Sequence, residues 1–279
     1  MMCNWKKGIS LSFFRNEKNE CTGADPEVLR QVREQGFQCV ELSFSHDDYF
    51  ERYHFADTAE EMYHYCKSLG LEIWSIHLPF SEKWDLSRED PKEVLRDFTL
   101  LLRASARAHI TVAVLHPSFE PVFPEERGKR LFCAKENIKL LNEEAKKSGV
   151  ILALENLPRT CLGNTSREMV DLLDATGTEF VFDTNHSLLE DNSSFLHYII
   201  ERGHCPVSLH ISDYDFVDER HELPGYGKNR WRSLLDLLKK SGYQGPALYE
   251  PAMYHMSGER IALKEISQNI CELLKGRIP

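Results

Sequence analysis

Two stretches, ITVAVL at residues 110–115 and VILAL at residues 150–154, decide how the fold is interpreted, because both are apolar at successive positions. A strand with water on one face alternates between apolar and polar residues, whereas an apolar run is typical of a strand that is covered on both faces. Strands of that kind occur in parallel sheets that helices cover on each side. The two stretches therefore favour an α/β fold with a parallel sheet.

Six more short segments rich in apolar or β-branched residues lie along the chain, and signals for helices separate them. Thr58 with Glu61, and Thr165 with Glu168, have the spacing of capping boxes, in which a helix begins at the threonine. Eight strands that alternate with helices in 279 residues predict a single-domain (β/α)8 TIM barrel over residues 1–279. A doubly wound sheet is the alternative, but the glycine-rich first turn that usually marks it is missing. The expected strands cover residues 8–14, 39–44, 72–77, 110–116, 150–155, 180–183, 207–212 and 247–250.

Charge, apolar segments and cysteine content indicate which binding partners and which cellular location to expect. Lys and Arg number 34 against 44 Asp and Glu, so the formal net charge is −10. That sign disfavours nucleic acid as a partner, since binding to phosphates relies on Lys and Arg. The chain has no signal-peptide pattern and no apolar stretch long enough to cross a membrane. Its eight cysteines are scattered singly, without a CxxC pair, so we expect a reduced, cytoplasmic protein that has no membrane partner.

Six successive expected strands carry a histidine or an acid at their last residue or, for His210, two residues before it. The C-terminal ends of barrel strands converge on one mouth, so these side chains are expected to meet there. Core hydrogen bonding or helix capping would explain any one of them, but crowded carboxylates repel one another unless a cation neutralises them. The sequence therefore predicts a divalent metal site. The six residues are His77, His116, Glu155, Asp183, His210 and Glu250.

The identity of the metal stays open at this point. Oxygen and nitrogen donors without a cysteine suit zinc, manganese, iron, cobalt or nickel, and magnesium is kept as a further candidate cofactor. Three residues just beyond the strand ends could add ligands: His186, three residues after Asp183, and Glu219 and His221 in the loop after the seventh strand. A helix cap is the alternative explanation for His186, and a solvated loop is the alternative for the other two.

Four short motifs give the chain a family resemblance. ALEN at 153–156, FDTNH at 182–186, LHISD at 209–213 and LYEP at 248–251 lie at the ends of the fifth to eighth strands. In this order they resemble the xylose-isomerase-like barrel superfamily, which includes ketose 3-epimerases, inosose dehydratases, sugar-phosphate isomerases and type IV apurinic endonucleases. The resemblance extends over essentially the whole chain. It implies that one divalent ion has four ligands, namely Glu155, Asp183, His210 and Glu250.

The same resemblance bears on the number of metal ions. In the apurinic endonucleases two more zinc ions are held at positions that match His77, His116, His186 and His221. The endonuclease loop after the seventh strand carries Asp-Arg-His, whereas this chain has Glu219-Arg220-His221. The departure leaves the number of ions open, between one and three.

The first functional interpretation is a divalent-metal-dependent isomerase or epimerase of a sugar or sugar phosphate. Removing a proton next to a carbonyl produces an enediolate, which a metal ion stabilises as charge develops on oxygen. The resemblance implies that Glu155 and Glu250 are the acid and base pair.

Further residues are candidates for contacts with the sugar. The resemblance implies that His186 binds a substrate hydroxyl. Phe80 and Trp84 could supply an apolar wall, although core or lid packing explains them equally well. Arg159 and Arg220 are candidates for binding a carboxylate or phosphate of the substrate, with exposed surface charge as the alternative.

The alternative function is a zinc-dependent phosphodiesterase that acts on abasic DNA, similar to the apurinic endonucleases. The net charge and the absence of a Lys/Arg-rich loop near the mouth speak against it. A barrel that binds a metal or a sugar without chemistry is a third class. Because related barrels often form dimers or tetramers, a homo-oligomer is a further expectation, and the sequence does not show its size.

Overall fold

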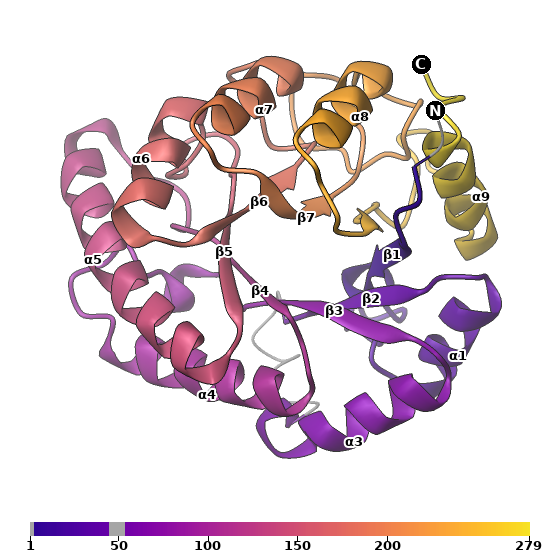
Figure 1. Ribbon diagram of the computed structural model, residues 1–279, viewed down its shortest axis with the longest axis horizontal. Coiled ribbons are helices and arrows are strands. Elements are labelled where there is room, and N and C mark those ends of the chain that lie inside the picture. The colour runs from indigo at the N-terminus through magenta and orange to yellow at the C-terminus, as the bar shows by residue number, and fades with distance from the viewer. Residues whose placement is uncertain (1–2, 45–53) are drawn as a thin grey trace.

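The computed structural model describes residues 3–44 and 54–279, and within them eight parallel strands form a barrel that eight helices surround (Figure 1). The expected (β/α)8 fold is confirmed. No helix in these two ranges has the length and apolar character that a membrane span needs. The strands are β1 (Lys7–Ser10), β2 (Cys39–Ser43), β3 (Glu72–His77), β4 (Val112–Leu115), β5 (Ile151–Glu155), β6 (Glu179–Asp183), β7 (Pro206–His210) and β8 (Ala247–Tyr249). The helices are α1 (Pro26–Glu34), α3 (Phe55–Ser68), α4 (Lys92–Arg107), α5 (Pro124–Ser148), α6 (Ser166–Thr176), α7 (Asn192–Glu201), α8 (Trp231–Lys240) and α9 (Leu263–Leu274), with short 3-10 helices η1 (Leu11–Phe13) and η2 (Glu82–Trp84) after β1 and β3.

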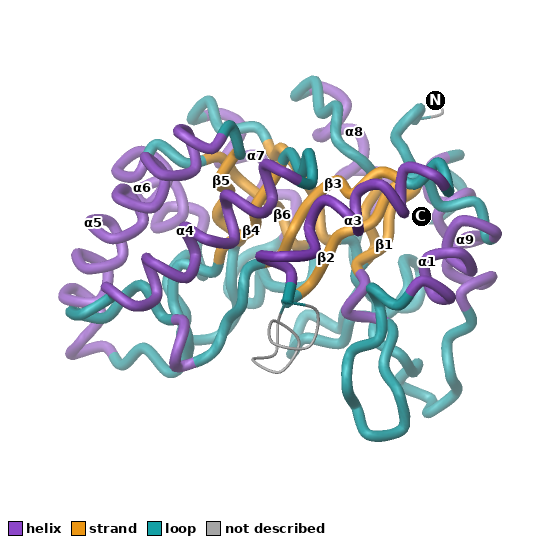
Figure 2. Tube along the Cα trace, turned by 90° about the horizontal axis from the view of Figure 1, so that it is seen from below, coloured by secondary structure: helices purple, strands orange, loops and turns teal. Residues whose placement is uncertain are grey.

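Hydrogen bonds close the barrel between its last two strands. Consecutive strands from β1 to β7 pair in parallel, and β1 also pairs with β8. Just beyond β7, Ile211 forms a parallel bridge with Tyr249, and the Glu250 N–H donates to the Ile211 carbonyl at 3.1 Å. The C-terminal ends of all eight strands therefore open toward one side, below the strands in Figure 2.

Apolar side chains occupy both faces of the strands. The larger group lies between the strands and the surrounding helices and includes the fully buried Leu154. A smaller group faces the barrel axis and consists of Val112, Val114, Ala153 and Val181. Successive residues of a strand thus alternate between the two groups. The apolar runs of the sequence arise because both groups exclude water.

Of the two expected capping boxes, the first half of one is present and the other is wrong: the carboxylate of Glu168 accepts from the Gly163 N–H at 2.8 Å and from Arg127, not from the Thr165 N–H. Thr165 is the N-cap of α6, and its hydroxyl oxygen accepts a hydrogen bond from the Glu168 N–H at 3.3 Å. Thr58 does not begin a helix, because α3 already begins at Phe55 and the Thr58 hydroxyl donates to the His54 carbonyl at 3.4 Å. The first strand is also shorter than expected, since η1 begins where β1 ends.

Two arginines of α5 form hydrogen bonds that hold loops at the mouth of the barrel in place. Arg130 Nη2 donates to Asp85 Oδ2 at 2.5 Å, which holds the loop after β3. Arg127 donates to both carboxylate oxygens of Glu168 and to the carbonyl of Cys161, which holds the loop after β5. These two loops are therefore fixed to the helix layer, and each of them contributes residues to the pocket described below.

The difference in burial between Leu154 and Leu140 predicts that their substitutions lower the free energy of unfolding by different amounts. Leu154→Ala removes a fully buried side chain between β5 and the helices, so we expect the free energy of unfolding to fall by about 2–5 kcal/mol. Leu140→Ala is the matched control, because Leu140 of α5 is 58% exposed and should change the same quantity by less than about 0.5 kcal/mol. Urea denaturation followed by circular dichroism measures both, and equal losses would contradict this description of the core.

Candidate metal centre at the barrel mouth

Four of the expected residues bring ligand atoms together at the barrel mouth. Glu155, Asp183 and His210 are the last residues of β5, β6 and β7, and Glu250 directly follows β8. Each residue offers one oxygen or nitrogen, and these four atoms lie within 4.8 Å of one another. We call this set the four-ligand group. Its position follows from the fold, because parallel strands of a barrel end on one rim.

Acids on two sides orient the ring of His210. Its Nδ1 lies 3.0 Å from Glu155 Oε1 and 3.3 Å from Glu250 Oε2, whereas its Nε2 donates to Glu41 Oε2 at 3.1 Å. Nδ1 is therefore the nitrogen that faces the other ligands. Burial lowers the pKa of His210, but Glu41, Glu155 and Glu250 outweigh burial and raise this pKa well above its usual value. The acids thus favour positive charge at Nδ1, and a divalent ion bound there would take the place of that proton.

Glu41 is a candidate that the strand-end pattern does not include. It lies in the middle of β2, is fully buried, and accepts a hydrogen bond from the Ser75 hydroxyl at 2.7 Å in addition to the one from His210. Burial raises the pKa of Glu41, but His210 and His77 outweigh burial and lower this pKa below its usual value. The signal in the sequence is a single acid inside the otherwise apolar segment CVEL.

An unpartnered oxygen supports a cation in the four-ligand group. Asp183 Oδ2 is buried and has no hydrogen-bond partner within the described residues, although buried carboxylate oxygens normally have one. Burial raises the pKa of Asp183 to about 7, against the effect of His186. A divalent ion would satisfy this oxygen and offset the cost of removing the carboxylates from water. The residues at this position therefore fit a divalent metal.

A second set of ligand atoms shares Glu155. His77 Nε2 and His116 Nε2 lie 3.1 and 3.2 Å from Glu155 Oε2. The His77 Nδ1–H donates to the Leu78 carbonyl at 2.8 Å, which leaves Nε2 as the nitrogen that can bind an ion. Burial lowers the pKa of His116 to about 4, so this ring is neutral, as a metal ligand must be.

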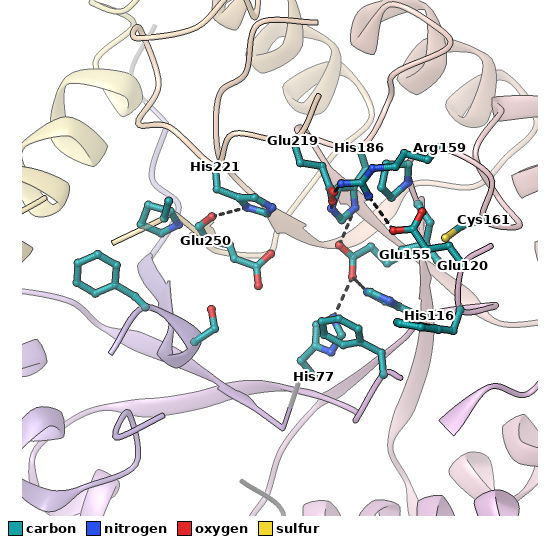
Figure 3. Close-up of a pocket in the computed structure, with 18 of the residues that line it drawn as sticks. His77, His116, Glu120, Glu155, Arg159, Cys161, His186, Glu219, His221 and Glu250 are labelled. Carbon is teal, nitrogen blue, oxygen red and sulfur yellow. Dashed lines mark hydrogen bonds and ion pairs between the residues drawn. The ribbon is translucent and has the colours of Figure 1, made fainter. Parts of the chain in front are cut away.

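A third set comes from the loops after β6 and β7. The His186 Nδ1–H donates to the Asn156 carbonyl at 2.9 Å, and the Nε2 atom lies 2.8 Å from Glu219 Oε1. The His221 Nδ1–H donates to the Glu250 carbonyl at 3.0 Å. His186, Glu219 and His221 offer ligand atoms within 4.8 Å of one another. All nine residues that the sequence suggests as ligands therefore lie at one mouth, and Figure 3 shows most of them around one pocket.

A pocket with a volume of about 350 Å³ opens onto the three sets (Figure 3). Phe80, in the loop after β3, lines the pocket and stacks on His116 with 4.3 Å between the ring centres. Arg159 also lines the pocket, but its guanidinium forms ion pairs with Glu120 at 3.1 Å, with Asp218 at 3.3 Å and with Glu219. An aromatic ring beside convergent polar groups suits a small polar ligand.

Two of the expected substrate contacts lie away from the pocket. Trp84 is buried and stacks on Phe98 of α4 with 5.5 Å between the ring centres. Arg220 forms an ion pair with Asp215 at 3.0 Å. Neither residue lines the pocket. Trp84 packs in the core and Arg220 forms an ion pair. The structure therefore does not support either residue as a substrate contact.

Comparison with known proteins identifies the family of this chain. Residues 29–271 match the model of the xylose isomerase-like TIM barrel family. A D-psicose 3-epimerase from Enterocloster bolteae is 24% identical over 240 residues, which cover 81% of this chain and 76% of the relative. Among solved structures, a D-tagatose 3-epimerase-like protein has a TM-score of 0.78 at 19% identity, with 98% of both chains covered. D-Psicose 3-epimerase from Clostridium cellulolyticum H10, solved with D-tagatose, has a TM-score of 0.76 at 18% identity and the same coverage. The two structures share the fold, and the family match shows that this chain belongs to the xylose isomerase-like TIM barrel family.

Proposed function

We propose that this chain is a divalent-metal-dependent epimerase or isomerase that acts on a sugar or sugar phosphate. The four-ligand group carries the proposal, because it places two pocket carboxylates, Glu155 and Glu250, beside a candidate metal position. The similarity to a protein named D-psicose 3-epimerase supports the same class of chemistry.

Glu155 and Glu250 would exchange protons with the sugar. An epimerase removes a proton from a carbon next to a carbonyl and returns a proton to the opposite face of the same carbon, whereas an isomerase returns the proton to the neighbouring carbon. Burial raises the pKa of Glu155, but His210, His116 and His186 outweigh burial and hold this pKa well below its usual value. Glu155 is therefore ionised and can accept a proton, and Glu250, three strands further round the barrel, would serve as its counterpart. A divalent ion, when bound, would stabilise the negative charge that develops on a substrate oxygen.

Other pocket residues would bind and orient the sugar. Burial lowers the pKa of His186, but Asp183, Glu155 and Glu219 outweigh burial and raise this pKa well above its usual value. In the protonated ring Nδ1 donates to the Asn156 carbonyl and Nε2 donates to Glu219 Oε1, so a sugar hydroxyl would bind at Nε2 by taking the place of Glu219. Phe80 would cover an apolar face of the sugar ring.

A second candidate is a zinc-dependent phosphodiesterase, which one observation favours: three sets of ligand atoms adjoin one another. Several clustered ions can activate a hydroxide and hold the attacking and leaving oxygens of a phosphodiester. Charge argues against a DNA substrate, because the net charge is −10 and three carboxylates surround Arg159 at the pocket. We therefore place sugar chemistry first.

The acid and base assignment predicts the effect of two amide substitutions. Glu155→Gln and Glu250→Gln should each lower kcat by about 10²- to 10⁴-fold, because an amide cannot exchange the proton. The measurement is turnover of a panel of ketoses and ketose phosphates by the metal-loaded protein, with metal content and circular dichroism recorded for every variant. Glu125→Gln is the control, since Glu125 is exposed on α5. Near-full activity of both pocket variants would refute the two-carboxylate mechanism.

The position of Glu41 predicts a change in metal affinity. Glu41→Gln keeps a hydrogen-bond acceptor for His210 but removes the negative charge behind the ring. We expect the dissociation constant for Mn²⁺ to rise by about 10- to 100-fold, as is typical when a group that orients a metal ligand is changed. Competition with a chelating dye measures this without any substrate. An affinity equal to that of the wild type and of Glu125→Gln would show that Glu41 does not support the metal site.

Metal content separates the two candidate functions. For the epimerase or isomerase we expect about one tightly held ion per chain, with ketose turnover that a chelator abolishes and added Mn²⁺ restores. Plasma mass spectrometry of the purified protein measures the content, and an abasic duplex is assayed beside the sugars. Three tightly held zinc ions per chain, together with cleavage of the duplex, would favour the phosphodiesterase.

A further inference from the structure

Most charged side chains that line the pocket have partners that balance them. Arg159 forms its ion pairs with three carboxylates, and Glu155 and Glu250 belong to the four-ligand group. Arg15 is different. It lines the same pocket, but none of the ion pairs within residues 3–44 and 54–279 involves it.

Arg15 keeps most of its hydrogen-bonding capacity for a ligand. Its Nη1 donates to the Asn19 carbonyl at 3.1 Å, which is the one hydrogen bond of this side chain within the described residues. A guanidinium carries five N–H donors, and two of them can bind two oxygens of a phosphate or carboxylate together. The residue is half-buried, so a ligand in the pocket would remove more water from it. That desolvation is costly unless the ligand brings an acceptor of opposite charge.

A short hairpin fixes the backbone on which Arg15 sits. Arg15 and Cys21 form an antiparallel bridge, and the Thr22 N–H donates to the Phe14 carbonyl at 2.8 Å. The side chain of Asn16 closes the turn, because its Oδ1 accepts hydrogen bonds from two backbone N–H groups at 3.0 Å each. The Cα of Arg15 is therefore held by hydrogen bonds on both strands of the hairpin, which reduces the entropy lost when a ligand binds.

Arg15 reaches the pocket from the side of the barrel opposite Arg159. Arg15 follows β1 and η1, Arg159 follows β5, and these two strands face each other across an eight-stranded barrel. The four-ligand group is formed by β5, β6, β7 and the end of β8. A ligand held there at one end can therefore direct its other end toward β1 and Arg15.

We propose that Arg15 binds an anionic substituent of the substrate, a phosphate or a carboxylate, so that the pocket prefers an acidic sugar to a neutral one. This inference rests on the proposed function and narrows its substrate class. Arg159 is less suited to the role because its charge is already balanced, and Arg220 lies outside the pocket. A neutral sugar would displace water from the Arg15 guanidinium without giving it a charged partner.

Isothermal titration of inorganic phosphate into the Mn²⁺-loaded, full-length protein tests the binding of the anion. Arg15→Ala should raise the dissociation constant for phosphate by about 10-fold or more, and Arg15→Lys should raise it less, because lysine keeps the charge but loses the two-pronged geometry. Arg202→Ala is the control and should bind phosphate as the wild type does, because Arg202 is exposed at the C-terminal end of α7, away from the barrel mouth. Unchanged affinity in Arg15→Ala, or an equal loss in Arg202→Ala, would overturn the inference.

The same titration with three sugars tests the preference and separates the two kinds of anion. D-fructose 6-phosphate carries a phosphate, D-glucuronate carries a carboxylate, and D-fructose carries neither. Arg15→Ala should weaken binding of at least one of the two anionic sugars by about 10-fold or more and leave D-fructose unchanged. Equal losses for all three sugars would overturn the inference. If the loaded wild type turns over no ketose and no ketose phosphate, the proposed function fails, whereas the titrations still decide the role of Arg15.

Discussion

The site depends on one electrostatic constraint: several carboxylates are buried at the same end of the barrel. Glu41, Glu155 and Asp183 are at most 1% exposed, and the ring of His210 lies among them. Carboxylates that are removed from water in this way need positive charge close to them. Histidines and, in the proposed function, a divalent ion supply that charge. The closed ring of strands holds the acids at fixed separations in spite of their mutual repulsion.

Much of this arrangement can be predicted from the sequence, because strand ends in a parallel barrel share one rim. Glu155, Asp183 and His210 end their strands as the sequence indicates, so their meeting follows from the fold alone. This rule does not predict Glu41, because Glu41 is not at a strand end. It occupies the middle of β2, where all five residues are buried, so that an alternation of apolar and polar residues cannot distinguish the two faces of the strand.

Side chains on the loops are a different case, because their contacts depend on how several loops meet. The sequence presents Arg159 and Arg220 as equivalent candidates for an anion. In the structure, Glu120 from the loop after β4 and Asp218 from the loop after β7 both reach Arg159, whereas Asp215 binds Arg220 within a single loop. Pairing between loops leaves no periodic pattern along the chain, so only the folded arrangement distinguishes a balanced arginine from one that is available to a ligand.

Glu155 has a consequence for how this site can diverge among related proteins. Its Oε2 lies near His77 and His116, and its Oε1 lies near His210 and His186, so that one carboxylate contacts all three sets of ligand atoms. Substitutions of Glu155 are therefore expected to be epistatic, since their effect on activity depends on all of the residues that Glu155 contacts. Residues at the outer edge contact fewer partners and can be exchanged with less disturbance. Evolutionary change in the substrate or in the number of metal ions is therefore expected to begin at the outer edge of the pocket, while Glu155 stays constant.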